Sequence, residues 1–253
     1  MATKRKVRIE WAMQTHVGLV RHTNQDAVGA EVEGGLFVVC DGMGGAAAGE
    51  LAAHMAVQIF LREAHRGGPD RGSVIANAAL VANREVYAYA QDNPRLRGMG
   101  TTLVALSVGV NVPAKANTIP LAITHIGDSR CYRFRGSTLE LLTEDHSLVG
   151  EQVRLGEMSE EEAAASPMRN VITRAVGTAA EVEADLLRAE GLEGDVYLLA
   201  SDGLTRDLSE KEIAELLELN DASLETAAEK LVQAANDAGG GDNTTVVLVR
   251  VGF

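Results

Sequence analysis

The sequence predicts an α+β sandwich in which antiparallel sheets are covered by pairs of helices. Two amphipathic helical patterns come first, a run of short apolar strands occupies the middle, and two further helical patterns come near the end. This grouping differs from the regular alternation of strands and helices in a parallel doubly wound sheet. No internal repeat or low-complexity linker divides the chain, so one domain over residues 1–253 is expected.

Apolar residues follow a strand or a helix period through most of the chain. Strands are predicted where they alternate or form short continuous runs, at 7–20, 36–40, 102–110, 119–126, 130–135, 138–142, 183–192, 196–200 and 244–251. Helices are predicted where apolar residues recur every three or four positions, at 50–65, 73–91, 209–219 and 223–238. A glycine-rich turn is expected at 41–49, and a polar segment with two short helices at 147–180.

The composition is that of an ordinary globular protein, with 46% apolar and 23% charged residues. No apolar stretch approaches the ~20 residues that a membrane span needs, so no membrane association is expected. The formal net charge is −13 and no basic stripe is visible, which disfavours a nucleic-acid partner. Cys40 and Cys131 are expected to be buried free thiols in a reducing cytoplasm, because neither belongs to a CxxC pair.

Four aspartates stand at the ends of predicted strands. Asp41 and Asp202 each follow an apolar run and precede a glycine, Asp128 follows the run ending at 127, and Asp242 follows three glycines. An isolated Asp-Gly is most often a simple turn. Several carboxylates at the mouths of apolar strands would be partly desolvated and would repel one another. A hard divalent cation such as Mg²⁺ or Mn²⁺ offsets both costs, and the pattern therefore indicates a metal site.

The glycine-rich turn has a second interpretation. Residues 42–47 match the GxGxxA dinucleotide-binding pattern between a strand and a helix. However, Asp41 would face a pyrophosphate there, and Glu63, the acidic residue at about the right spacing, lies within a predicted helix. The glycines are better explained by a backbone that approaches a metal closely.

Eight motifs together resemble the PP2C (PPM) family of metal-dependent Ser/Thr phosphatases, bacterial type. They occur in family order over nearly the whole chain: RHTNQD at 21–26, VCDGMGG at 39–45, GMGTT at 98–102, GDSR at 127–130, LTEDHS at 142–147, NVITRAVG at 170–177, SDGL at 201–204 and GDNTT at 241–245. The resemblance implies a four-layer α-β-β-α sandwich, two antiparallel sheets flanked by helix pairs, with a dinuclear metal centre at one end. It also implies a flap subdomain at about 147–180.

The resemblance also implies roles for individual residues. Asp41 would bridge both metals, and the Gly42 carbonyl would bind the second. Asp202 and Asp242 would hold the first metal. Asp26 would contact the second metal through a water, and Asp128 would bind a third and weaker metal. Arg21 would clamp the substrate phosphate, and Asn243 would orient Asp242 or its loop.

The implied reaction is hydrolysis of phosphoserine and phosphothreonine in proteins by a metal-activated water, with two Mn²⁺ or Mg²⁺ ions and a possible third. A bacterial Ser/Thr kinase and its targets are the implied partners, and a cytoplasmic monomer is expected. The sequence departs from the family at Met43 and Ala46, where many members carry a histidine that protonates the leaving group. It also carries Ser166-Pro167 in the flap, where His-Pro is frequent.

Two other functions compete with this interpretation. A pseudophosphatase that binds phosphoproteins could share the fold, but such modules tend to lose metal ligands, whereas Asp41, Asp202 and Asp242 are all present. A metal-dependent phosphodiesterase or nuclease is disfavoured by the charge of −13 and the lack of a basic groove.

Overall fold

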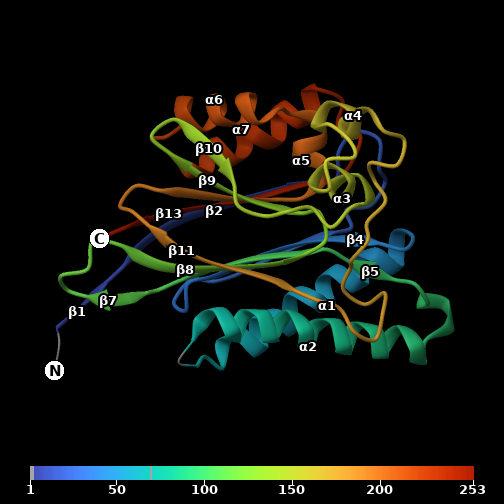
Figure 1. The fold of residues 1–253 in the computed structure, drawn as a ribbon, viewed down its shortest axis with the longest axis horizontal. Coiled ribbons are helices and arrows are strands. Elements are labelled where there is room, and N and C mark those ends of the chain that lie inside the picture. The colour runs from blue at the N-terminus through green and yellow to red at the C-terminus, as the bar shows by residue number, and fades with distance from the viewer. Residues whose placement is uncertain (1–2, 69) are drawn as a thin grey trace.

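Two antiparallel sheets lie face to face between two groups of helices, as Figure 1 shows. The computed structural model describes residues 3–68 and 70–253. The predicted α+β class and the four-layer order of helix, sheet, sheet and helix are confirmed. Residues 1–2 of the expected domain lie outside the described residues.

The first sheet has the strand order β10-β9-β12-β13-β2. Its strands are β2 (Arg8–His16), β9 (Arg130–Arg135), β10 (Thr138–Leu141), β12 (Val196–Ala200) and β13 (Thr244–Gly252). Helices α6 (Glu210–Leu219) and α7 (Leu224–Asp237) cover its outer face. Both begin at a serine N-cap, Ser209 and Ser223, whose hydroxyl accepts a backbone N–H of the first turn.

The second sheet has the order β11-β8-β6-β4-β3, with β5 paired to β4. Its strands are β3 (Asp26–Glu31), β4 (Leu36–Met43), β5 (Gly100–Thr101), β6 (Leu103–Val108), β8 (Ile119–Ile126) and β11 (Asp185–Gly191). Helices α1 (Ala46–His65) and α2 (Arg71–Asp92) cover its outer face.

The other elements are short. They are β1 (Lys4–Lys6) paired with β7 (Asn111–Pro113), the 3-10 helix η1 (Pro94–Leu96), and the helices α3 (Leu148–Arg154), α4 (Glu160–Ala165) and α5 (Asp202–Asp207). Both α3 and α4 belong to the polar segment at 147–180, where two short helices are predicted. In Figure 1 they lie beside α5, at one end of the sandwich.

The central strands are apolar on both faces because each sheet is covered on both sides. In β4, Phe37 and Val39 pack between the sheets, whereas Val38 and Cys40 pack against α1 and α2. This period of two explains why 36–40 reads as a continuous apolar run. Cys40 and Cys131 are both buried and free, as expected. Within the described residues, no helix has both the length and the apolar character needed to cross a lipid bilayer.

The predicted turn at 41–49 is wrong in its extent. Strand β4 continues to Met43, because Gly42 and Met43 pair with β5, and α1 begins at Ala46 rather than at residue 50. Only Gly44 and Gly45, both with positive φ, separate the strand from the helix. Strand β3 and helix α5 are not among the predicted elements.

Candidate metal centre

Asp26 and Asp41 are direct partners across the β3–β4 ladder. Asp26 is the first residue of β3 and is buried, and its Oδ2 accepts a hydrogen bond from Ser201 Oγ at 2.8 Å. Burial, and after it the charges of Asp202 and Asp242, raises the pKa of Asp26 to about 6. The antiparallel register thus brings together two acidic residues that are fifteen positions apart in the sequence.

The backbone around Asp41 is fixed by two threonines. The Asp41 N–H donates to Thr102 Oγ1 at 2.9 Å, and the Asp41 carbonyl accepts from Thr101 Oγ1 at 2.9 Å and from the Thr102 N–H at 2.8 Å. With both backbone groups bonded, the position of the Asp41 side chain depends on its own torsions alone.

Gly42 stands where no side chain could fit. A Cβ at this position would lie 2.2 Å from the carbonyl oxygen of Gly49 and 2.7 Å from that of Gln25. These contacts are with backbone atoms that cannot move aside, so the close approach of β4 to the start of α1 requires glycine.

Asp202 and Asp242 are joined by arginine side chains. Asp202 is the first residue of α5, and Asp242 precedes β13. Arg206 hydrogen-bonds Asp202 Oδ2 through one terminal nitrogen and donates to Asp242 Oδ2 at 2.8 Å through the other. Arg21 also donates to Asp242 Oδ2 at 2.8 Å, with a side chain that is 49% exposed. The two carboxylates therefore lie on either side of one guanidinium.

Asp128 completes the set on the far side of Asp202. It follows β8 in a tight turn and is buried. Burial, and after it the charges of Asp202 and Asp145, raises the pKa of Asp128 to about 7. The preceding Gly127 has a φ of +108°.

All five predicted aspartates converge on one region, with Asp41 at its centre. The pKa of Asp41 is raised well above its usual range, first by burial and then by the charges of Asp26, Asp202, Asp128 and Asp242. The carboxyl group of Asp41 is also within hydrogen-bonding reach of that of Asp202. Desolvation and mutual repulsion both disfavour the ionised forms here, which is the situation that a bound cation relieves.

One atom of the cluster lacks a partner. Asp26 Oδ1 is buried and has no hydrogen-bond partner among the described residues. A buried carboxylate oxygen without a partner is costly. Together with an all-oxygen donor set, this unsatisfied oxygen fits a site for a hard divalent cation or for a water held by one.

Asn243 ties the loop of Asp242 to the segment before β3. Its Oδ1 accepts the Gln25 N–H at 2.8 Å, and its Nδ2 donates to the carbonyl oxygens of Val17 at 2.8 Å and Thr23 at 3.0 Å. Its own backbone N–H donates to Asp242 Oδ1 at 2.9 Å. Asn243 thus contacts the Asp242 carboxylate through its backbone, and its side chain fixes the backbone at Val17, Thr23 and Gln25.

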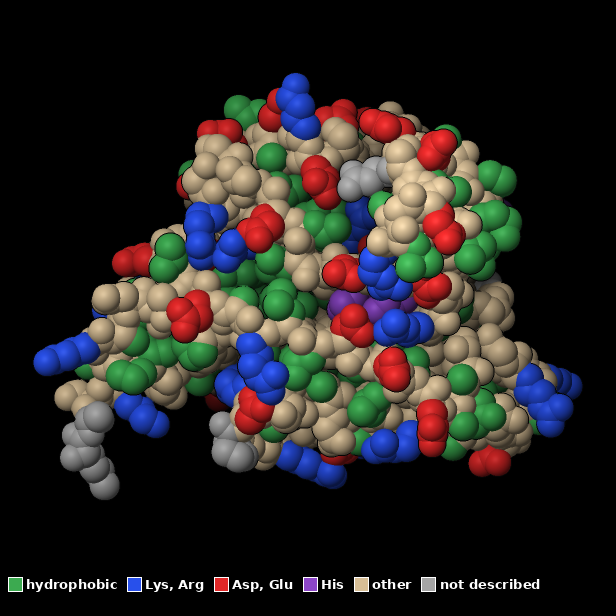
Figure 2. Space-filling view, viewed as in Figure 1, with side chains coloured by type: hydrophobic (Ala, Val, Ile, Leu, Met, Phe, Trp, Pro, Cys, Tyr) green, Lys and Arg blue, Asp and Glu red, His purple; other side chains and the backbone are tan. Residues whose placement is uncertain are grey.

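A second polar group lies nearby. Among the described residues, the one set of three His, Cys, Asp or Glu side chains whose donor atoms all lie within 4.8 Å is His125, His146 and Asp185. The two imidazoles stack with ring centroids 4.6 Å apart. Figure 2 shows histidine side chains gathered in one place on the face viewed, between acidic and basic side chains.

In this histidine group the charge of the Asp185 carboxylate is balanced by an arginine of the same chain. Arg174 donates to Asp185 Oδ1 at 3.0 Å and lies 3.3 Å from His146 Nε2. His146 Nδ1 accepts the Gly127 N–H at 3.1 Å, so in neutral His146 the proton is on Nε2, which points toward Asp185. His146 also joins the backbone of the 147–180 segment, because its carbonyl accepts the Thr173 N–H at 2.8 Å.

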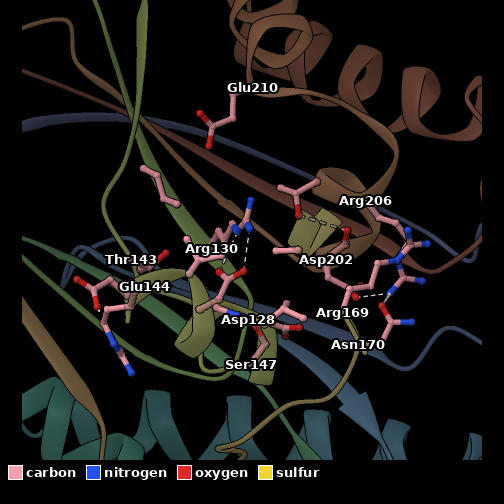
Figure 3. Close-up of a pocket in the computed structure, with 18 residues that line it drawn as sticks. Asp128, Arg130, Thr143, Glu144, Ser147, Arg169, Asn170, Asp202, Arg206 and Glu210 are labelled. Atoms are coloured by element: carbon pink, nitrogen blue, oxygen red, sulfur yellow. Dashed lines mark hydrogen bonds and ion pairs between the residues drawn. The ribbon is translucent and has the colours of Figure 1, made fainter. Parts of the chain in front are cut away.

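A pocket of about 560 Å³ opens beside the aspartates. Figure 3 shows Asp128 and Asp202 between Arg130 on one side and Arg169 and Asn170 on the other, with Glu210 at the top of the view. Its walls come from the segment around α3 and α4 and from α5 and α6. A substrate segment could therefore lie next to the carboxylate cluster.

Arg206 is the residue of this site that the sequence interpretation missed. A signal was present, since Asp202 and Arg206 are four residues apart and would share one face of a helix. The sequence predicts a strand at 196–200 and no helix before 209, whereas the structure begins α5 at Asp202.

Comparison with known proteins decides the family. The sequence profile described as protein phosphatase 2C matches residues 19–238. The chain belongs to the protein phosphatase 2C family. It is therefore a protein phosphatase of the PPM type, and the resemblance stated from its motifs is confirmed.

Curated relatives of this phosphatase come from several bacteria. It is 37% identical to the serine/threonine phosphatase stp of Listeria welshimeri, over 93% of each chain. It is also 37% identical to the protein phosphatase PhpP of Streptococcus pneumoniae, over 95% of this chain and 97% of that one. Solved structures agree with the fold: the Mycobacterium tuberculosis phosphatase PstP superposes with a TM-score of 0.86 at 35% identity, over 97% of this chain and 99% of that one.

A second structure of the PstP catalytic domain is described as a complex with two manganese ions. It superposes on this phosphatase with a TM-score of 0.84 at 34% identity, over 98% of this chain and 100% of that one.

Proposed function

We propose that this phosphatase hydrolyses phosphoserine and phosphothreonine in proteins, using divalent cations held by its aspartate cluster. The observation that carries the proposal is the convergence of Asp26, Asp41, Asp202 and Asp242 on one region, where burial and then the charges of the neighbouring aspartates raise the pKa of Asp41. The relatives named as serine/threonine phosphatases support the substrate class. The manganese complex of the PstP domain supports Mn²⁺ or Mg²⁺ as the ion.

The residues would divide between two ions. Asp41 would serve both, and its interactions with Asp26 and with Asp202 support this role. Asp202 and Asp242 would hold the first ion, and the Gly42 carbonyl would bind the second. Asp26, with its unsatisfied Oδ1, would act on the second ion through a water. Asp128 would serve a third and weaker ion.

Bound divalent cations supply Lewis acidity, which lowers the pKa of water toward neutrality so that hydroxide can attack phosphorus. The chain itself contributes orientation and charge. Arg21, half exposed at the edge of the cluster, can turn its planar fork to two phosphoryl oxygens at once. Asn243 keeps the loop of Asp242 in register with the segment that carries Arg21.

Residues 147–180 would form the flap, with α3 and α4 on the wall of the 560 Å³ pocket. A substrate segment bound there would lie beside Asp128 and Asp202 and would make binding contacts that a small phosphate ester cannot make. A bacterial Ser/Thr kinase and its targets are the proposed partners, and the proposed working form is a cytoplasmic monomer.

The decisive experiment is hydrolysis of a phosphothreonine peptide with Mn²⁺, with EDTA and in the Asp202→Ala variant. We expect turnover that needs Mn²⁺, stops with EDTA and falls by at least ~10³-fold in Asp202→Ala, because a preorganised charge is lost at the reacting centre. Asp221→Ala is the matched control, since Asp221 is an exposed aspartate that pairs with Arg250. Metal-independent turnover or an unimpaired Asp202→Ala variant would refute the mechanism.

The pseudophosphatase alternative makes the opposite prediction. It requires tight binding of the phosphothreonine peptide without turnover at saturating Mn²⁺. The presence of all the predicted carboxylates in one cluster favours the enzyme.

A further inference from the structure

Arg206 lies one helical turn after Asp202 and places its guanidinium between two of the proposed metal ligands. One terminal nitrogen bonds Asp202 Oδ2, and the other donates to Asp242 Oδ2 at 2.8 Å. Figure 3 shows the Arg206 side chain beside Asp202. A planar guanidinium can donate hydrogen bonds to two carboxylates at once, and its width sets the distance between them.

The oxygens of Asp242 have little capacity left. Oδ2 accepts from both Arg206 and Arg21, each at 2.8 Å, and Oδ1 accepts the Asn243 N–H at 2.9 Å. A carboxylate oxygen offers about two lone-pair sites. An ion that uses Asp242 Oδ2 must therefore replace at least one guanidinium N–H.

The two arginines are not equivalent. The Arg21 side chain is 49% exposed and contacts one carboxylate, so it can leave into solvent toward a substrate. The Arg206 side chain is 19% exposed and contacts both. A dication coordinated by Asp202 and Asp242 would lie within a few Å of the Arg206 charge, where repulsion between like charges is strong.

Arg206 also has a neutral partner besides the two carboxylates. Its side chain lines the 560 Å³ pocket, and NH2 is 3.5 Å from Asn170 Oδ1 on the flap side. A rotation about the side-chain torsions would turn the guanidinium away from the two carboxylates and into this pocket. The positive charge of Arg206 would then be solvated in the pocket, next to the carboxylate cluster.

We propose that Arg206 is a built-in competitor of the first metal ion. In the metal-free protein its guanidinium stands in for the cation and neutralises Asp202 and Asp242, and it moves toward Asn170 when a divalent cation binds. The inference rests on the proposed function, because it takes these carboxylates to be metal ligands.

The test is calorimetric titration of Mn²⁺ into EDTA-stripped protein, for the wild type and Arg206→Gln. We expect the Kd for Mn²⁺ to fall by about tenfold in the variant, because no like charge opposes the ion. The same substitution should lower the Tm of the metal-free protein by ~3 °C, since the repelling carboxylates lose their partner. Stability and metal affinity thus change in opposite directions.

Arg62→Gln is the matched control. Arg62 also bridges two carboxylates, those of Glu63 and Glu85, but on the surface of α1 and α2. It reports the effect of removing one positive charge from the molecule as a whole. We expect its Kd for Mn²⁺ to stay within about twofold of the wild type, because exposed charges are screened.

Each other outcome is decisive. An unchanged Kd in Arg206→Gln would make Arg206 a structural ion pair only, and a raised Kd would make it a residue that orients the ligands; either overturns the inference. Wild-type protein that takes up no Mn²⁺ would overturn the proposed function as well. Should Arg206→Gln fail to fold, Arg206→Met serves instead, because it also removes the positive charge from beside the two carboxylates. A Kd for the methionine variant at or above the wild-type value would overturn the inference.

Discussion

The side-chain oxygen of Asn243 accepts the backbone N–H of Gln25 at 2.8 Å. Through this bond and the two that its amide nitrogen donates, Asn243 joins the Asp242 loop to the segment that leads into β3 and Asp26. The carboxylates of the cluster come from different sheets, and Asn243 is the side chain that fixes the spacing between two of the segments that carry them.

Replacing Asn243 by alanine should therefore weaken both the fold and the metal site. We expect Asn243→Ala to lose ~2–3 kcal/mol of unfolding free energy, because buried backbone groups lose their partners. Chemical denaturation in EDTA measures this loss, and Mn²⁺ titration should show weaker binding. Asn220→Ala is the control, since within the described residues the Asn220 side chain makes one hydrogen bond, to the Leu216 carbonyl near the end of α6. Equal effects of the two substitutions would contradict the role given to Asn243.

Gly203→Ala should disturb the same loop from the opposite side. A Cβ on Gly203 would lie 2.0 Å from the carbonyl oxygen of Asn243, so α5 or the loop must shift. We expect a loss of ~2 kcal/mol or more in unfolding free energy, comparable to overpacking a core. Gly241→Ala is the matched control, because a Cβ there meets nothing within 4 Å. Thermal unfolding of the two variants in EDTA compares them directly, and a Gly203→Ala variant as stable as Gly241→Ala would be unexpected.

Arg21→Lys tests the proposed phosphate clamp. A lysine keeps the charge but cannot donate to two phosphoryl oxygens from one plane. At saturating Mn²⁺ we expect kcat/KM for a phosphothreonine peptide to fall by ~10-fold or more, which corresponds to one lost charge-assisted hydrogen bond. Arg154→Lys, an exposed arginine paired with Glu144 at the pocket wall, should change it little. Equal rates for wild type and Arg21→Lys would remove Arg21 from the proposed mechanism.

The leaving group should matter unusually strongly for this phosphatase. After Asp41 the chain carries Met43 at the end of β4 and Ala46 at the start of α1, and the next histidine, His54, is exposed on α1. General acid catalysis is worth about 10²–10⁴-fold, and an alkoxide needs it more than a nitrophenolate does. We expect p-nitrophenyl phosphate to be cleaved well relative to a phosphothreonine peptide when single-turnover rates are compared. A chemical step much faster for the peptide would show that another group supplies the proton.

His146 should make the stability of the protein depend on pH. Burial, followed by the charges of His125 and Arg174, lowers the pKa of His146 below 6.5. A depressed histidine pKa means that the folded state binds fewer protons than the unfolded state, so stability is present above pH ~6.5 and is lost as pH falls. The difference in unfolding free energy between wild type and His146→Asn should therefore be larger at pH 7.5 than at pH 5.5. Denaturation in EDTA at both values provides the measurement, and a difference that does not vary with pH would contradict the prediction.

The fold could be predicted where the hydrophobic pattern is strong. Strands β8, β9 and β12 match the predicted ranges residue for residue, and α1, α2, α6 and α7 differ from theirs mainly at the first turn. Strand β3 was missed because its sequence, DAVGAE, has one β-branched residue and no clear alternation. Its place in the sheet depends on pairing with β4, which the local sequence does not specify.

The aspartates of the site could be predicted from the sequence, whereas Arg206 could not. Asp41, Asp128, Asp202 and Asp242 each lie beside an apolar run or a glycine, which marks them in the sequence, whereas Asp26 comes from the family motif at 21–26 alone. The partners of Arg206 are set by tertiary structure, since Asp242 is 36 residues away and becomes a neighbour only when β13 pairs with β12. Asn243 was expected to support Asp242, but its contacts with Val17, Thr23 and Gln25 could not be foreseen.

The two cysteines offer a use that follows from their burial. The reactive form of a cysteine is the thiolate, and burial raises the pKa of Cys40 and raises that of Cys131 to about 12. At neutral pH the native protein should thus resist alkylating reagents, and labelling would report only molecules that have opened globally. A single cysteine engineered into the segment around α3 would then accept a fluorophore selectively, without prior removal of the natural thiols.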